Sequence, residues 1–341
     1  MLQASWTADG IELVDREPPP LVDGWTRLAV TGCGICGSDL HIYRGMRGGD
    51  LSPTDFAVPG HEMAGTVLDG PPGLDDALYA VEPWFNCQTC TLCVQGATTL
   101  CEDGLLLGIS GAGGLSELVD VPTRLLHPVP DGVDPALASL AEPWAVAVRA
   151  IHRAGQVQVG ERVLVLGGGT IGLLCGVAAR DRAAVVGVTC RYPHQADLAR
   201  RFGLTPIDPD DLTAWADDLR PGVVIETVGG EADTMDEAVR SARSGGRIVV
   251  VGVFGPRRPT DYRTIVLKEL EIVGSIYYGT VGTGSEFGAA VATMGALADE
   301  LSALQTHRFP LSEAALAFTT ANDKSSQAVK VTISPAAAPA P

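Results

Sequence analysis

The chain has 341 residues, more than a single compact core usually accommodates, so two domains are expected. Its 24 lysines and arginines stand against 41 acidic residues, and the formal net charge of -17 disfavours nucleic acid and anionic membranes as partners. The N-terminus lacks a basic stretch followed by an apolar core, and no apolar run approaches the ~20 residues that span a bilayer. We therefore expect a cytosolic protein with neither nucleic acid nor a membrane as its partner.

Two segments near the N-terminus combine cysteine, histidine and acidic residues. Residues 31 to 45 read TGCGICGSDLHIYRG and include Cys36, and residues 58 to 67 read VPGHEMAGTV and include His61 and Glu62. An isolated His-Glu pair is more often ordinary surface or a hydrogen-bonded core pair than a metal site. Cys33 gives a C-x-x-C spacing with Cys36, but the thioredoxin-like βαβ context of a redox motif is missing.

Four of the eight cysteines lie within residues 86 to 101, NCQTCTLCVQGATTLC. In a reducing compartment, clustered thiols at C-x2-C-x2-C-x7-C spacing predict a metal site. These residues are Cys87, Cys90, Cys93 and Cys101. Four thiolates complete a tetrahedral zinc and leave no position for substrate, so the predicted site is structural. An iron–sulfur cluster and a set of free thiols remain the alternatives.

The next segments predict a helix and then a nucleotide-binding turn. Residues 140 to 151, LAEPWAVAVRAI, place Glu142 at the expected start of a helix, and residues 162 to 180 read RVLVLGGGTIGLLCGVAAR. The latter predict a strand over 163–166, a glycine turn and a helix from residue 170, with G-x-G-x-x-G between them. This context indicates a dinucleotide fingerprint, with pyrophosphate at the helix N-terminus. Its residues are Gly167, Gly169, Thr170, Ile171 and Gly172.

Alternating strands and helices follow the fingerprint. We predict strands within residues 183–190, 222–229, 245–255 and 269–278, and helices within 194–203 and 232–243. Continuous apolar strands separated by helices predict a parallel sheet covered on both faces, a Rossmann-like fold. Gly252 and Ser275, in the last two strand segments, are assigned to the same cofactor site.

Together these motifs resemble the zinc-dependent medium-chain dehydrogenase/reductase family, in particular its sorbitol, butanediol and threonine dehydrogenase branch, from about residue 10 to residue 333. The resemblance implies a catalytic zinc bound by Cys36 and His61, with Glu62 as a ligand or an exchanging ligand. Glu142 stands where alcohol dehydrogenases proper carry a second cysteine ligand, and this harder donor points to the polyol branch. Zinc with an open coordination position acts as a Lewis acid that lowers the pKa of an alcohol.

The resemblance also implies a proton relay. Ser38 stands where the family carries the hydroxyl that receives the substrate proton, and His41 is placed to pass it to solvent. The alternative for His41 is an ordinary surface histidine. Asp39 is expected to support His61 from behind or to cap a helix. We therefore expect hydride transfer between a secondary alcohol (a polyol, diol, cyclitol or amino alcohol) and NAD(P). The alternatives are a catalytically silent nucleotide-binding relative and a ketone reductase of a biosynthetic intermediate.

The end of the second strand bears on the choice of cofactor. An acidic residue there binds the ribose 2′-hydroxyl and repels a 2′-phosphate. The chain reads VTCRYPHQ, with Cys190 in place of the family's Asp and no acid before Asp197. Arg191 and His194 offer positive charge instead, which favours NADP(H) over NAD. The alternative is that Arg191 is a solvated arginine that stacks on adenine.

The resemblance divides the chain into domains. It implies a GroES-like β-barrel catalytic domain over 1–144 with a zinc lobe at about 86–102, a Rossmann domain over 145–279, and a return to the catalytic domain over 280–333. Residues 334–341 are expected to be disordered. A cleft between domains is the expected substrate site. The strand near residues 272–278 is expected at a sheet edge that pairs across a homodimer, with a tetramer possible.

Overall fold

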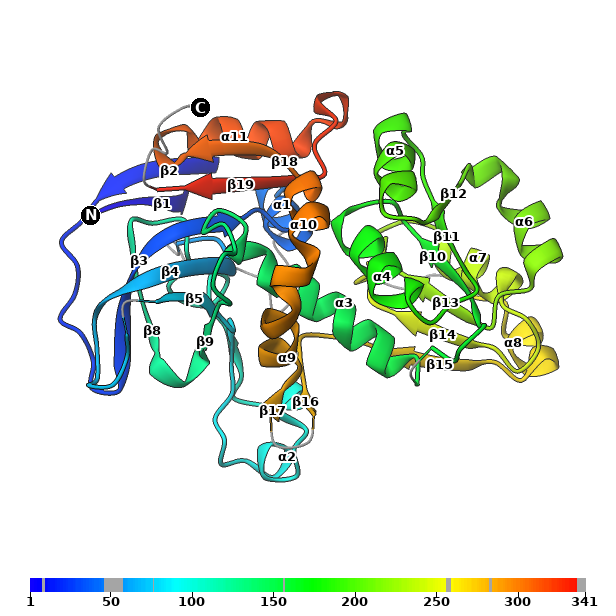
Figure 1. Cartoon of the computed structure of the whole chain (residues 1–341), viewed down its shortest axis with the longest axis horizontal. Helices are drawn as coiled ribbons and strands as arrows, with labels where there is room; N and C mark the ends of the chain where they lie inside the picture. Colours follow the sequence, from blue (N-terminus) through cyan, green and yellow to red (C-terminus); the bar gives the residue numbers. More distant parts are fainter. Residues whose placement is uncertain are drawn as a thin grey trace. The chain divides into compact units, whose positions relative to one another are not determined.

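The structure, a computed structural model, describes residues 1–7, 10–45, 58–75, 77–155, 157–255, 259–281 and 284–335. The chain forms two compact units, Met1–Ala145 with Tyr278–Pro341, and Val146–Tyr277 (Figure 1). Most of the predicted tail, residues 336–341, lies outside the described residues.

The first unit is built on a seven-stranded sheet with the order β18-β19-β3-β4-β5-β9, in which β8 also pairs with β3. All neighbours are antiparallel except β18 and β19, which are parallel. Two-stranded sheets add β1-β2, β6-β7 and β16-β17. The strands are β1 Leu2–Thr7, β2 Gly10–Asp15, β3 Trp25–Gly34, β4 Glu62–Asp69, β5 Leu78–Val81, β6 Trp84–Phe85, β7 Leu105–Leu106, β8 Leu118–Pro122, β9 Leu126–Pro128, β16 Thr280–Val281, β17 Gly284–Ser285, β18 Gln305–Pro310 and β19 Lys330–Ser334.

Alternation along the strands explains the core of this unit. In β3 the buried positions Thr26, Leu28 and Val30 alternate with partly exposed ones, as expected for a strand with one face on the core. The helix α11 packs on β18 and β19 (Figure 1), and its Phe318 meets Trp6 edge-on with ring centroids 5.4 Å apart. The helices of this unit are α1 Gly37–Tyr43, α2 Thr91–Val94, α9 Glu286–Thr293, α10 Ala298–Leu304 and α11 Ala314–Asn322. Helix α3, Ala141–Arg153, begins in this unit and continues into the second, which starts at Val146.

The second unit is a six-stranded parallel sheet with the order β12-β11-β10-β13-β14-β15. Its strands are β10 Arg162–Leu166, β11 Val185–Thr189, β12 Thr205–Ile207, β13 Val223–Glu226, β14 Arg247–Val250 and β15 Glu271–Gly274. Its helices are α4 Thr170–Arg180, α5 Pro193–Arg201, α6 Leu212–Leu219, α7 Thr234–Ser241 and α8 Tyr262–Lys268. The predicted strands and the predicted helices α4, α5 and α7 are all present, whereas β12, α6 and α8 were not predicted.

One long apolar helical run was not expected from the sequence. Among the described residues, Glu286–Leu304, which joins α9 and α10, is long and apolar enough by length and composition to cross a membrane. Core helices of soluble proteins meet the same criterion, so this run is weak support for a membrane span.

Candidate active site

Antiparallel pairing of β3 with β4 brings the first predicted metal ligands together. Gly34, at the end of β3, pairs with Glu62, at the start of β4, while Cys36 caps helix α1 immediately beyond β3. The ligand atoms of Cys36, His61 and Glu62 lie within 4.8 Å of one another. A Cβ added at Gly34 would lie 1.9 Å from Oε2 of Glu62, so only glycine leaves room for this carboxylate.

Asp39 lies beside this group, at the third position of α1 rather than at its N-cap, which is Cys36. Its Oδ2 accepts a hydrogen bond from the backbone N–H of Cys36 at 2.8 Å, and its Oδ1 lies 3.9 Å from Nδ1 of His61. These last two atoms are buried and have no hydrogen-bond partner among the described residues. Burial lowers the pKa of His61, but Cys36 and Asp39 together raise it well above the ordinary value. A cation is therefore favoured among these groups, and thiol, imidazole and carboxylate are donors that suit zinc.

Lys330 on β19 completes the surroundings of Glu62. Its Nζ donates to Oε1 and Oε2 of Glu62 at 2.7 and 2.8 Å and to the carbonyl of Ile35 at 3.1 Å. Both side chains of the ion pair are buried. Burial lowers the pKa of Lys330, and Glu62 more than offsets this and raises it. Lys330 was not predicted from the sequence, although a single lysine within the apolar run AVKVTI was a signal for a paired buried charge.

Glu142 lies outside the three-residue ligand group. It is the second residue of α3, as predicted, and its Oε1 accepts a hydrogen bond from the Tyr278 hydroxyl at 2.5 Å. Burial, opposed by the nearby His61 and assisted by Glu62, raises the pKa of Glu142 to about 7. Tyr278 was not predicted as a site residue, and the ligand role of Glu142 stays a prediction.

The predicted proton-relay residues lie on α1. Ser38 and His41 both fall within this helix, directly after Cys36. The Oγ of Ser38 is buried without a hydrogen-bond partner among the described residues, which leaves it free to meet a polar group of a ligand. His41 is partly exposed, and burial lowers its pKa. A buried hydroxyl followed by a neutral, partly exposed imidazole is suited to moving a proton.

The four lobe cysteines converge as predicted. Cys87, Cys90, Cys93 and Cys101 place their sulfurs within 4.8 Å of one another, around the short helix α2. Backbone N–H groups point at these sulfurs: Cys90 N–H donates to the Cys87 sulfur at 3.2 Å and Cys87 N–H to the Cys101 sulfur at 3.3 Å. Such donors, chiefly the N–H of Cys90, lower the pKa of Cys87 to about 6, which favours the metal-binding thiolate.

The second unit carries the predicted nucleotide fingerprint at the carboxyl edge of its sheet. Gly167 adopts φ +110° and follows β10 directly, and α4 begins at Thr170 with Ile171 next to it. A Cβ at Gly172 would lie 1.7 Å from the carbonyl oxygen of Gly167, so close packing of helix and strand requires glycine here. Gly169 is the N-cap of α4.

The remaining predicted cofactor residues also follow the carboxyl ends of strands. Cys190 comes after β11, Gly252 after β14 and Ser275 after β15. The Cys190 thiol is buried and donates to the carbonyl of Val188 at 3.5 Å, whereas Arg191 is exposed. Asp197 lies within α5, as expected. The side chain available to a ribose substituent is therefore that of Arg191 rather than Cys190.

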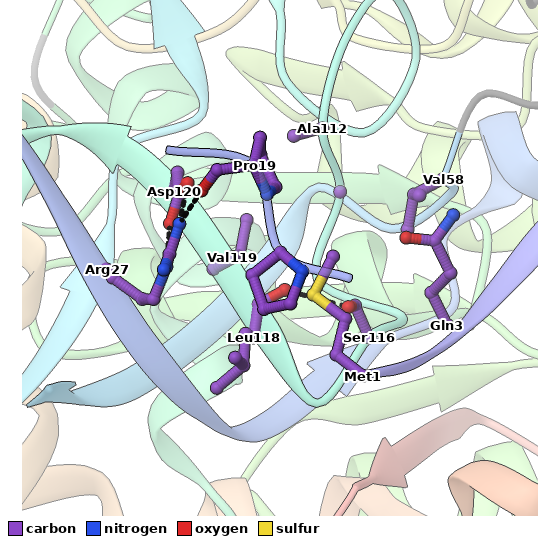
Figure 2. A pocket seen from close by; sticks show the side chains of 12 residues that line it. Met1, Gln3, Pro19, Arg27, Val58, Ala112, Ser116, Leu118, Val119 and Asp120 are labelled. Atoms are coloured by element: carbon purple, nitrogen blue, oxygen red, sulfur yellow. Dashed lines mark hydrogen bonds and ion pairs between the residues drawn. The ribbon is translucent and has the colours of Figure 1, made fainter. Parts of the chain in front are cut away.

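A cavity of about 70 Å³ in the first unit lies among other residues (Figure 2). Arg27 and Asp120, joined by hydrogen bonds of 2.8 Å, line it together with Met1. The cavity contains none of the predicted metal or proton-relay residues, and its volume suits a few waters rather than a substrate. We therefore do not place the active site there.

A three-donor metal group in one unit and a dinucleotide-binding sheet in the other are the features of a metal-dependent oxidoreductase. Family models match the chain at two places: the alcohol dehydrogenase GroES-like domain over residues 22–131 and the zinc-binding dehydrogenase domain over residues 170–296.

Individual relatives agree with these matches. L-galactonate-5-dehydrogenase of Escherichia coli is 31% identical over 310 residues, which cover 86% of this chain and 87% of the relative. The 2-dehydro-3-deoxy-L-galactonate 5-dehydrogenase of Pseudoalteromonas atlantica is 31% identical over 75% of this chain and 76% of its own length. A crystal structure of a zinc-binding dehydrogenase from Sinorhizobium meliloti, bound to NADP, is 27% identical, covers 98% of this chain and 99% of its own, and has a TM-score of 0.87.

The chain belongs to the zinc-type medium-chain alcohol dehydrogenase family. The predicted fold class, a GroES-like domain with a Rossmann domain, is confirmed. The protein is an enzyme of the alcohol dehydrogenase type, and membership of this family implies zinc, a nicotinamide cofactor and a small-molecule substrate.

Proposed function

We propose that the protein is a zinc-dependent dehydrogenase that transfers a hydride between a secondary alcohol of a hydroxyl-rich small molecule and a nicotinamide cofactor, with NADP(H) preferred. The observation that carries this proposal is the convergence of the ligand atoms of Cys36, His61 and Glu62 within 4.8 Å. Two residues after Cys36, the hydroxyl of Ser38 is buried without a hydrogen-bond partner among the described residues. Two relatives named as sugar-acid 5-dehydrogenases support a polyhydroxylated substrate.

The first unit would serve as the catalytic domain and the second as the cofactor domain. Cys36 and His61 would hold the catalytic metal, with Glu62 or Glu142 as the acidic ligand. Bound zinc supplies Lewis acidity, which lowers the pKa of the substrate hydroxyl. The Ser38 hydroxyl would take up the proton that the substrate releases, and His41 would pass it to solvent.

A second zinc, held by the four lobe cysteines, would be structural, because four thiolates leave no open position. Preference for NADP(H) is supported by the absence of an acid after β11 and by the exposed Arg191, which can pair with a 2′-phosphate. A homodimer or homotetramer is also proposed, with the edge strand β15 at its interface.

Cys36→Ser tests the metal assignment. Wild-type protein should hold two zinc ions per chain and reduce NADP in the presence of a polyol, diol or sugar acid, with a higher kcat/KM for NADP than for NAD. The variant should hold one zinc and lose turnover by at least about a thousandfold, because Lewis-acid activation is lost. Zinc content by atomic absorption and cofactor absorbance give the two readouts.

Cys175→Ser is the matched control, since Cys175 is a buried thiol on α4 far from either cysteine group in the sequence. It should keep both zinc ions and full turnover. A Cys36→Ser variant that retains full activity would remove Cys36 from the catalytic site. Wild-type protein that binds zinc and cofactor but converts none of these alcohols, nor the matching ketones with NADPH, would refute the proposed reaction.

A further inference from the structure

The last residue of β13 is a buried glutamate that neither the metal group nor the fingerprint includes. Glu226 is 0% exposed. Its Oε1 accepts three hydrogen bonds, from the N–H groups of Val228 and Gly229 at 2.8 and 3.0 Å and from the Thr234 hydroxyl at 2.7 Å. Its Oε2 has no hydrogen-bond partner among the described residues. A carboxylate is costly to bury, so its presence here calls for a role that an apolar side chain could not fill.

Glu226 joins the loops that follow β13 and β14. Its carbonyl accepts hydrogen bonds from the N–H groups of Val251 and Gly252 at 2.9 and 3.1 Å. A Cβ at Gly252 would lie 2.4 Å from Oε2, so the carboxylate occupies the space that a side chain there would need. The two loops are also hydrogen-bonded to each other directly, since the N–H of Gly230 donates to the carbonyl of Val253 at 2.8 Å.

The loop after β13 also contacts the fingerprint turn. The Thr227 hydroxyl donates to the carbonyl of Leu166 at 2.7 Å, and its N–H donates to the same oxygen at 3.1 Å. A Cβ at Gly167 would lie 2.8 Å from the Thr227 hydroxyl oxygen. The position of the loop is therefore fixed from both sides, by Leu166 and by Glu226.

The order of the strands in the parallel sheet indicates which half of the cofactor these loops would face. The order reverses at β10, with β11 and β12 on one side and β13, β14 and β15 on the other. A dinucleotide lies across the carboxyl edge at such a point, with its adenosine ribose over the end of the strand that follows the fingerprint, here β11. The nicotinamide half then lies over the ends of β13 and β14, where Glu226 joins the loops.

We propose that Glu226 is a positioning residue for the nicotinamide half of the cofactor. It orders the loops 227–230 and 251–255 before the cofactor arrives, so that binding does not have to supply the ordering free energy. The inference rests on the proposed cofactor site at the carboxyl edge of this sheet. A glutamate that only stabilised the core would affect both halves of the cofactor equally.

The test compares the better-bound reduced cofactor with its own adenosine half, 2′,5′-ADP for NADPH or ADP for NADH. Glu226→Met, which keeps the size but removes the acceptor, should weaken the reduced cofactor about tenfold or more and leave the adenosine half within about twofold. Glu226→Gln, which keeps one acceptor oxygen, should retain most of the affinity. Calorimetry gives the dissociation constants, and faster amide exchange at Val228 and Gly229 in the Met variant reports loss of loop order.

Val224→Ala is the matched control, because Val224 is 0% exposed in the same strand and belongs to the apolar core. It should lower the stability of the protein without weakening the binding of the reduced cofactor more than that of its adenosine half. Thr234→Val removes one of the three donors and gives the same readouts if Glu226→Met fails to fold. Equal weakening of both ligands, or none, overturns the proposal. Wild-type protein that binds neither ligand would instead overturn the cofactor site itself.

Discussion

The ion pair of Lys330 with Glu62 allows a stability prediction for single residues. Lys330→Met should destabilise the zinc-free protein by about 3–5 kcal/mol, because Glu62 is left as a buried charge without its partner. In the zinc-loaded protein the loss should be smaller, because the metal cation can compensate the same carboxylate. Urea unfolding with and without bound zinc measures both values.

The double variant Lys330→Met/Glu62→Gln is the control for this prediction. Removing the charge together with its partner should recover most of the lost stability, since no buried ion then remains. A double variant as unstable as Lys330→Met alone would show that Lys330 acts through packing rather than through Glu62.

The convergence of the four lobe cysteines was predictable from their spacing, whereas that of Cys36 and His61 was predictable only from the resemblance to a known family. Lys330 was not predicted because its partner Glu62 lies 268 residues away in the sequence. The two side chains meet only through the pairing of β19 with β3 and of β3 with β4. Glu226 was not predicted because a single acidic residue at the end of an apolar strand has no local sequence pattern that marks it. Tertiary pairing, not local pattern, decides these positions.

At the scale of elements, Lys268 connects two helices. It lies at the end of α8, and its Nζ donates to the carbonyls of Val239, Arg240 and Ala242 at the end of α7, at 3.2, 2.6 and 2.7 Å. These carbonyls lack helical partners, and a cation there also complements the helix dipole. Lys268→Met should cost about 1–2 kcal/mol of the free energy of unfolding.

Urea unfolding, followed by a signal from the second unit, measures this loss. Lys268→Arg, which keeps the charge, should lower the free energy of unfolding by less. Equal losses in both variants would mean that the exact lysine geometry matters more than the charge. No loss in either would show that solvent satisfies these carbonyls just as well.

Helices and strands were predictable from the sequence where the apolar pattern extended over many residues. The strand and helix around the glycine turn agree with the prediction to within one residue, because β10 and α4 are both mostly buried and the glycines mark the turn. The strand β12 is only three residues long and carries Pro206, so its sequence gave no alternation to detect. Helix α6, which follows it, has an αL residue at its end that is Arg220 rather than the usual glycine.

At the scale of the whole molecule, the edge of the parallel sheet is the surface that the proposed association of two copies would use. β15 is an edge strand, as predicted, and Ile272 on it is 40% exposed. Nearby in the sequence, the apolar side chains of Val266 and Leu267 on α8 are 72% and 66% exposed. An uncovered apolar edge is a site for pairing with another chain. The net charge of -17 opposes association of two copies, so added salt should strengthen it.

Ile272→Lys tests this interface, since a lysine on an edge strand opposes pairing with a second edge. The wild-type protein should be at least a dimer by light scattering at 0.15 M salt, and its dissociation constant should fall as salt rises. The variant should be monomeric at the same concentration. Val159→Lys, at an apolar position that is 88% exposed and outside the sheet, should remain assembled. A monomeric wild-type protein, or dissociation by both substitutions alike, would show that β15 is not the interface, and the exposed edge would then be tolerated because the strand is only four residues long.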